Sequence, residues 1–371
     1  MTETTKPEFR GATHLLRGIC AFSVLIWHYQ HFFYIGTDAV GYDYRAQPFF
    51  EFLKVFYLLG YQAVPAFWCI SGLVMTQTYI NNSDFSMRNF VIARFSRLYP
   101  VHLTTLGVLS VLQIFSQLKF GEYQIFGANN LYNFLLHLLF VQGWRLPNSG
   151  NAFNAQTWSV SVEIAVYWFF YLAIKRIRKF KILGASIVLI CCLIVREVPD
   201  SIFLYLFFID CLTYFAAGIV IYFAIEQIRL TSRVLQISIN GFILFLVFLA
   251  RHFGLLVNPS RAWFLILTVL VFIGAQFDES IFKMQLKKLK IIGDLSYSVF
   301  LWHIPIQVLV KIFAHDIVKN GHYANGKIFF LSYLTATYLV GYFSFKVIET
   351  PTQDFLRRRY TKISRTVRAR A

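Results

Sequence analysis

Charged residues are scarce in this sequence, and that scarcity decides its class. Asp, Glu, Lys and Arg make up only 14% of the 371 residues, whereas hydrophobic residues make up 57% and aromatic residues 19%. In a soluble domain, about a quarter of the residues carry a charge. The composition is therefore that of a polytopic membrane protein, and the length leaves little room for a separate soluble domain once the spans are placed.

Acidic residues are the rarer of the two charged classes. The chain has 18 Asp and Glu residues against 35 Lys and Arg residues, which gives a formal net charge of +17. A strongly basic balance is typical of nucleic-acid-binding proteins, but here the basic residues lie between apolar runs. We therefore expect no nucleic-acid partner, and we expect the basic tail from Arg357 to Arg370 to lie against anionic lipid.

Cysteine is also rare, with five residues that all lie within apolar runs. They show neither metal-ligand spacing nor a disulfide framework, so we interpret them as small buried hydrophobic residues. We expect no metal and no permanently bound cofactor. We see no internal repeat, and no small-residue cleavage site follows the first apolar run, so we interpret that run as a retained span.

The apolar stretches predict an all-α integral membrane protein with about ten transmembrane helices. Each stretch is about the length needed to cross the hydrocarbon core. The expected spans lie near residues 12–35, 57–80, 98–118, 158–176, 180–196, 202–226, 234–250, 261–277, 291–314 and 328–348.

A further apolar stretch near 131–141 is too short to span comfortably. If it does not cross, and both termini are cytoplasmic, most of the 35 basic residues fall in cytoplasmic segments, as the positive-inside rule requires. We therefore predict a short re-entrant or interfacial helix within an external region from 119 to 157. Residues 1–352 would form one membrane-embedded domain, and 353–371 a basic cytoplasmic tail.

The first span contains two ionisable residues, Arg17 near its start and His28 deep inside it. Their spacing is close to three helical turns, which puts both side chains on one face about 16 Å apart along the axis. Ionisable groups inside a membrane span are costly and usually functional. The pair suggests a ligand lying along the helix. The alternative is that Arg17 extends to the interface and His28 is an ordinary core histidine.

A second basic pair, Arg94 and Arg97, precedes the third span and shares one helical face. Pro100 follows the pair and suits an early helical turn. Two guanidinium groups on one face form a good site for a phosphorylated ligand. The alternative is a simple positive-inside anchor.

Polar residues recur inside other spans. Glu163 would lie about 7.5 Å deeper than Trp158 in the fourth span, where a buried carboxylate needs a cation or a proton. His303 falls at about mid-membrane, a depth like that of His28. The remaining candidates for supporting or substrate-binding roles are Ser71, Ser159, Asp210, Ser296 and Tyr297.

Taken together and in this order, these residues resemble the acyltransferase 3 family of integral-membrane acyltransferases. The matching positions cover residues 10 to 352 and end with Glu349-Thr350-Pro351, which is similar to the family's closing pattern. Two positions depart from the family's usual residues, Val160 in place of Leu and Phe300 in place of Tyr. Both are apolar-compatible and leave the proposed polar roles intact.

The resemblance implies a function and a set of partners. The family acylates carbohydrates such as lipopolysaccharide O-antigens and exopolysaccharides, so we expect O-acylation of a cell-surface or exported glycan in a bacterial inner membrane. The donor would be a cytoplasmic acyl-CoA, expected to be acetyl-CoA, bound as a co-substrate by Arg17, Arg94 and Arg97. His28 would act as general base or carry the acyl group itself, and Glu163 would orient His28 or bind the sugar.

Two other classes of function fit parts of the pattern. Intramembrane His, Asp and Arg residues also occur in secondary transporters or flippases for anionic or glycan substrates, although no repeat relates the two halves here. A non-catalytic scaffold or sensor would not need converging Arg and His residues. Consumption of acyl-CoA by the purified protein would discriminate between these classes and an acyltransferase.

Overall fold

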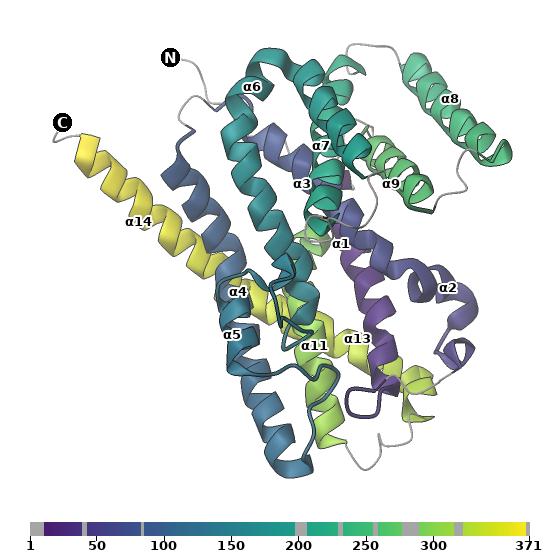
Figure 1. The fold of residues 1–371 in the computed structure, drawn as a ribbon, viewed down its shortest axis with the longest axis vertical. Coiled ribbons are helices and arrows are strands. Elements are labelled where there is room, and N and C mark those ends of the chain that lie inside the picture. The colour runs from purple at the N-terminus through teal and green to yellow at the C-terminus, as the bar shows by residue number, and fades with distance from the viewer. Residues whose placement is uncertain are drawn as a thin grey trace. The chain divides into compact units, whose positions relative to one another are not determined.

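The fold is helical throughout the part of the chain that the structure, a computed structural model, describes (Figure 1). Apart from one isolated β-bridge between Ile35 and Asp38, the described residues contain no β-strand pairing. The all-α prediction is thus confirmed there. The described ranges are 11–38, 43–82, 85–196, 206–228, 233–254, 259–276, 289–314 and 322–368.

Within those ranges, five helical segments are long and apolar enough to cross a membrane, by length and composition. They support an integral membrane protein, while the count of ten spans stays a prediction. The five segments are Phe50–Tyr79, Met87–Phe120, Phe207–Ile228, Lys290–Phe313 and Lys327–Tyr360.

The chain forms two compact units, each built from three segments of sequence. The first unit comprises Met1–Cys20, Tyr61–Ser83 and Val162–Asp294. The second unit comprises Ala21–Gly60, Asp84–Ser161 and Leu295–Ala371. We describe each unit by itself.

Helices α3 (Ala63–Tyr79) and α7 (Leu206–Ile228) form the centre of the first unit, and α9 (Pro259–Gln276) contacts both. Helix α8 (Arg233–His252) contacts α9 (Figure 1). Glycines let α3 and α7 approach closely. A Cβ atom at Gly72 would lie 2.0 Å from the Phe215 carbonyl oxygen, and one at Gly218 would lie 2.0 Å from the Cys69 carbonyl oxygen. Small residues allow such close backbone approach in membrane helix pairs.

Helix α6 runs from Trp158 to Val195 and covers the two spans predicted near 158–176 and 180–196. Its backbone leaves the helical region at Lys181, with φ of 48° and ψ of −127°. Two helices therefore meet at this kink, which lies close to the break expected between 176 and 180. The basic residues around the break made the sequence resemble an ordinary loop.

In the second unit, α11 (Lys290–Phe313, from Leu295 onward) and α4 (Met87–Phe120) are joined by a hydrogen bond from the Tyr297 hydroxyl to the Leu98 carbonyl, 2.6 Å long. Helix α13 (Lys327–Ser344) continues through the π-helical turn η9 (Phe345–Glu349) into α14 (Thr350–Arg368). Helix α14 lies beside α4 (Figure 1), where the Arg88 guanidinium is 4.8 Å from the Tyr360 ring centroid. The helix thus continues through residue 353, where the tail was expected to begin.

The expected position of Pro100 at the start of a helix was wrong. We expected this proline in an early turn, but it lies inside α4, which begins at Met87. The Ser86 side chain caps the helix by accepting a hydrogen bond from the Asn89 backbone amide. Because the helix starts this early, Arg94 and Arg97 lie within it.

Shorter elements of the second unit are α2 (Phe50–Leu59), η2 (Tyr44–Ala46), α5 (Leu131–Leu138), η4 (Gln142–Trp144), η5 (Ala155–Thr157) and η8 (His322–Asn325). Helix α5 lies in the stretch where a short helix was expected.

Helix α1 (Gly11–Trp27) is followed directly by the 3₁₀ helix η1 (His28–Phe33). The turn is held by buried aromatic residues: Tyr29 and Phe32 are fully buried, and the Tyr29 hydroxyl donates to the Ala324 carbonyl at 2.7 Å. The Tyr323 hydroxyl donates to the Phe32 carbonyl at 3.1 Å. These contacts fix the position of His28.

We predict that Gly72→Ala destabilises the protein by about 1–3 kcal/mol, because the new methyl group would push the α7 backbone away. The measurement is thermal unfolding of purified protein in detergent. Gly241→Ala in α8 is the matched control, because a Cβ atom there meets nothing within 4 Å. The control should unfold at the wild-type temperature or slightly above it. Equal unfolding temperatures for the two variants would contradict the proposed close packing.

Candidate functional site

The imidazole rings of His28 and His303 meet in the second unit. Their ring centroids are 4.8 Å apart, which agrees with the similar depth that their sequence positions suggest. His303 is fully buried, and 9% of the His28 surface is exposed. Two histidines from separate helices, η1 and α11, thus share one apolar site.

Backbone carbonyls define the tautomer of both rings. His28 Nδ1 lies 2.9 Å from the Val24 carbonyl oxygen, and His303 Nδ1 lies 2.6 Å from the Phe300 carbonyl oxygen. A carbonyl oxygen only accepts, so both Nδ1 atoms carry a proton. The neutral ring then has its lone pair on Nε2. His28 is therefore arranged so that Nε2 is its basic atom.

A third histidine, His31, joins this pair, and the sequence analysis missed it. Its ring centroid is 5.0 Å from that of His28. Side chains three residues apart eclipse in a 3₁₀ helix, so the 3₁₀ geometry of η1 brings these two rings together, with their planes tilted by 48°. No pattern in the apolar run signalled a 3₁₀ turn.

The neighbouring face of α11 adds Gln307 and Lys311, which the sequence analysis also missed. Together with His303 they follow a four-residue spacing, which places them on one helical face. Gln307 is fully buried and Lys311 is 1% exposed, and Lys311 Nζ donates to the Tyr34 carbonyl at 2.5 Å. Polar residues every four positions in an apolar helix were the signal that could have revealed them.

In the described part of the chain, no group of three or more His, Cys, Asp or Glu residues is arranged to hold a metal ion.

Arg94 and Arg97 are half-buried on α4 in the second unit. The Tyr297 hydroxyl bonds to α4 one residue after Arg97, so Tyr297 supports the helix that presents the arginine pair. Ser296, beside Tyr297, is buried. The sequence prediction of one shared face for the two arginines fits their place in a continuous helix.

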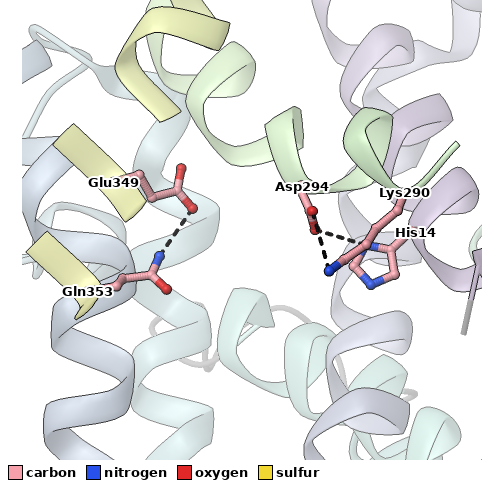
Figure 2. Close-up of polar contacts among 5 residues, drawn as sticks. All are labelled: His14, Lys290, Asp294, Glu349 and Gln353. Carbon is pink, nitrogen blue, oxygen red and sulfur yellow. Dashed lines mark hydrogen bonds and ion pairs between the residues drawn. The ribbon is translucent and has the colours of Figure 1, made fainter. Parts of the chain in front are cut away.

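Arg17 lies in the part of α1 that belongs to the first unit. There basic groups surround the Asp294 carboxylate. His14 Nδ1 is 3.2 Å and Lys290 Nζ is 3.9 Å from its oxygens (Figure 2), and Arg17 interacts with it electrostatically. Gly293 permits this arrangement, because a Cβ atom there would lie 2.3 Å from the His14 carbonyl oxygen.

The other candidates in the first unit have partners of their own. The Tyr167 hydroxyl donates to Glu163 at 2.7 Å. Asp210 forms an ion pair with Arg196 at 2.7 Å, which gives this carboxylate a structural partner that the sequence analysis did not identify. Ser71 is half-buried on α3 beside Gly72.

Trp158 and Ser159 open α6 and lie in the second unit. Ser159 is buried and its hydroxyl donates to the Gln156 carbonyl at 3.3 Å. The backbone of η4 comes close to Trp158, since a Cβ atom at Gly143 would lie 2.3 Å from the Trp158 carbonyl oxygen. These contacts connect the start of α6 to the segment before it.

Glu349 is a buried carboxylate that accepts hydrogen bonds from side chains. The Ser298 hydroxyl donates to it at 2.8 Å, and Gln353 Nε2 donates to it at 3.3 Å (Figure 2). The carboxylate lies in the π-helical turn η9, an irregularity often found at functional sites. The bond from Ser298 attaches η9 to α11.

A second buried histidine pair joins α4 to α5. His102 Nε2 donates to the His137 carbonyl at 2.8 Å, and the two ring planes are nearly parallel. Burial lowers the pKa of His137 from 6.5 to about 3, His102 lowers it further, and a hydrogen bond with the Ala152 carbonyl opposes the shift. His137 is therefore neutral in the folded protein above about pH 3.

The comparisons with known proteins agree with these motifs. Residues 11–346 match the model of the acyltransferase 3 family, described as an acyltransferase domain. The chain therefore belongs to this family. It is also similar to the acyltransferase MdmB of Streptomyces mycarofaciens, with 34% identity over 122 residues. That similarity spans 33% of this chain and only 30% of the length of MdmB. No solved structure matches the chain.

We predict that the protein loses stability as the pH falls from 6.5 toward 3. In this window the unfolded chain protonates His137 but the folded protein does not, so protons favour unfolding. Between pH 7 and pH 5 this histidine accounts for about 2 kcal/mol. His137→Gln keeps a donor for Ala152 without the titration, so its unfolding temperature should fall less over this range. An unchanged pH dependence in the variant would contradict the assignment.

Proposed function

We propose that this protein transfers an acyl group from cytoplasmic acyl-CoA to a hydroxyl of a cell-surface or exported glycan, with His28 as the general base. The observation that carries the proposal is the tautomer of His28. Because Nδ1 donates to the Val24 carbonyl, the basic Nε2 is available for a hydroxyl proton. The proposed setting is a bacterial inner membrane with both chain termini in the cytoplasm, as the family resemblance and the distribution of basic residues suggest.

The proposed reaction balances without a cofactor. His28 Nε2 accepts the hydroxyl proton while the hydroxyl oxygen attacks the thioester carbonyl carbon. The carbon–oxygen bond forms, the carbon–sulfur bond breaks, and the proton passes to the departing thiolate. In a variant of this mechanism, Nε2 carries the acyl group before the hydroxyl attacks. Acetyl is the expected group, because family resemblance favours acetyl-CoA as the donor.

The arginines are the proposed donor site. Guanidinium groups bind phosphate oxygens with paired hydrogen bonds, and Arg94 and Arg97 share one face of α4. Arg17 is assigned to the same ligand on sequence grounds. Glu163 is proposed to bind the sugar or to orient His28. Ser71, Trp158, Ser159 and Asp210 are proposed to support substrate binding.

We predict that His28→Ala abolishes acyl transfer while the variant still binds acetyl-CoA. The measurement follows free thiol released from acetyl-CoA by purified protein, with and without a crude glycan pool. His252→Ala, an exposed histidine at the end of α8, is the control and should keep wild-type activity. Wild-type activity in His28→Ala would remove both the base and the acyl-carrier roles. Absence of both donor binding and thiol release in the wild type would favour a transporter and direct the work to liposome assays.

We predict that Arg97→Gln raises the KM for acetyl-CoA by about 10-fold to 100-fold, because a charged hydrogen bond to phosphate contributes about 1.5–3 kcal/mol. The kcat should change little. Acetyl-pantetheine, which lacks the nucleotide phosphates, is the discriminating substrate: wild type and variant should use it equally well. A KM that rises equally for both substrates would place Arg97 outside the phosphate site.

A further inference from the structure

One buried amide connects the elements of the histidine site. Gln307 Nε2 lies 2.9 Å from the His28 carbonyl oxygen and 3.1 Å from the Tyr333 hydroxyl, and Gln307 Oε1 lies 3.2 Å from His31 Nδ1. The amide thus joins α11 to η1 and α13. Gln307 itself is fully buried.

The bonds of Gln307 determine which way its amide faces. The His28 carbonyl oxygen only accepts hydrogen bonds, so the atom next to it must be the amide nitrogen. Oε1 therefore faces His31, and His31 Nδ1 must carry the proton. The lone pair of His31 then lies on Nε2.

All three rings of the cluster consequently share one tautomer. His28 and His303 donate from Nδ1 to backbone carbonyls three or four residues earlier in the chain. His31 differs from them, because its Nδ1 donates to a side chain from another helix. Substitution of Gln307 can therefore change the tautomer of His31 and leave the other two rings unchanged.

We propose that Gln307 is a positioning residue that holds the backbone at His28 and fixes His31 in the Nδ1–H tautomer, so that the cluster presents unprotonated Nε2 atoms to an incoming hydroxyl. The three Nδ1–H groups are all engaged. A hydroxyl that enters the cluster is therefore received as a donor, which is the orientation that proton removal by His28 needs. This role rests on the proposed function of His28 as the base.

Methionine is the informative replacement at this position. It resembles glutamine in length, fills a buried site well, and makes none of the three amide hydrogen bonds. The matched control is Ser298→Ala, which also removes one buried hydrogen bond from α11. Similar unfolding temperatures for the two variants would show that stability alone does not explain a difference in rate.

In Gln307→Met we expect kcat for acyl transfer to fall at least 10-fold and the KM for acetyl-CoA to stay within about twofold. Ser298→Ala should keep at least half of the wild-type kcat. A folded Gln307→Met variant with wild-type kcat would overturn the proposal. So would an equal loss of kcat in Ser298→Ala, because the loss would then not be specific to the cluster.

The tautomer of His31 is measured directly by nitrogen-15 NMR of histidine-labelled protein in lipid bilayers, since protonated and unprotonated ring nitrogens have well-separated shifts. His31→Asn identifies the His31 signals. We expect the Nδ1–H form in the wild type and a mixture, or the Nε2–H form, in Gln307→Met. An unchanged His31 tautomer in that variant would overturn the proposal.

Gln307→Glu keeps the test decisive if the methionine variant fails to fold. Glutamate retains the length of the side chain and offers an oxygen acceptor to His31 in either protonation state. It should therefore preserve the Nδ1–H form of His31 in the same NMR experiment. Loss of that form in Gln307→Glu would contradict the assigned role of Oε1.

The outcomes separate this inference from the proposed function. If His28→Ala is inactive and Gln307→Met is fully active, the base assignment holds and the positioning role fails. If His28→Ala is fully active, the base assignment fails. The tautomer measurement then decides by itself whether Gln307 orients His31, because it does not depend on turnover.

Discussion

Hydrocarbon offers a buried polar group no hydrogen-bond partner, so a partner has to come from the protein itself. The histidine cluster follows from this constraint. His28 and His303 each use a backbone carbonyl three or four residues earlier in the chain, and His31, where the chain has tightened into a 3₁₀ turn, bonds with Gln307 instead. Each Nδ1 atom is thereby satisfied. The same pairing leaves the basic character of each ring on Nε2.

Different kinds of residue hold each of the two units together. In the first unit, Gly72 and Gly218 let α3 and α7 meet backbone to backbone. In the second unit, bulky aromatic residues such as Tyr29, Phe32 and Phe330 surround the turn that begins with His28. A close glycine contact fixes the distance between two helices, whereas aromatic packing with hydroxyl bonds to carbonyls fixes an irregular turn.

Periodicity and composition predicted the helical class and placed apolar segments near most of the described helices. They placed Pro100 wrongly, because the cap at Ser86 lies upstream of the apolar run that defined the expected span. They placed a break between two helices close to Lys181 but could not show that it is a kink, since a run of basic residues looks the same in a loop and in a kinked helix. Hydropathy measures how apolar a segment is, and it does not show where a helix begins or bends.

The candidate site was predictable to the extent that single residues are unusual in their surroundings. His28 and His303 are conspicuous as ionisable groups in apolar runs, and the structure brings their rings together. His31 was hidden because its position beside His28 depends on 3₁₀ geometry, which no residue pattern in that segment indicates. Gln307 is an uncharged residue, so a search for titratable groups passed over it. Its importance comes from three bonds to residues distant in sequence.

The partner of His28 Nδ1 also bears on how long the ring would hold a proton. In a Ser-His-Asp triad, a buried carboxylate accepts from Nδ1 and stabilises the imidazolium that forms. Here the acceptor is the neutral carbonyl of Val24, which orients the ring without a full opposing charge. An imidazolium at His28 would therefore be short-lived in an apolar site. In the proposed acyl transfer the proton leaves His28 again at once, because a departing thiolate is a strong enough base to take it.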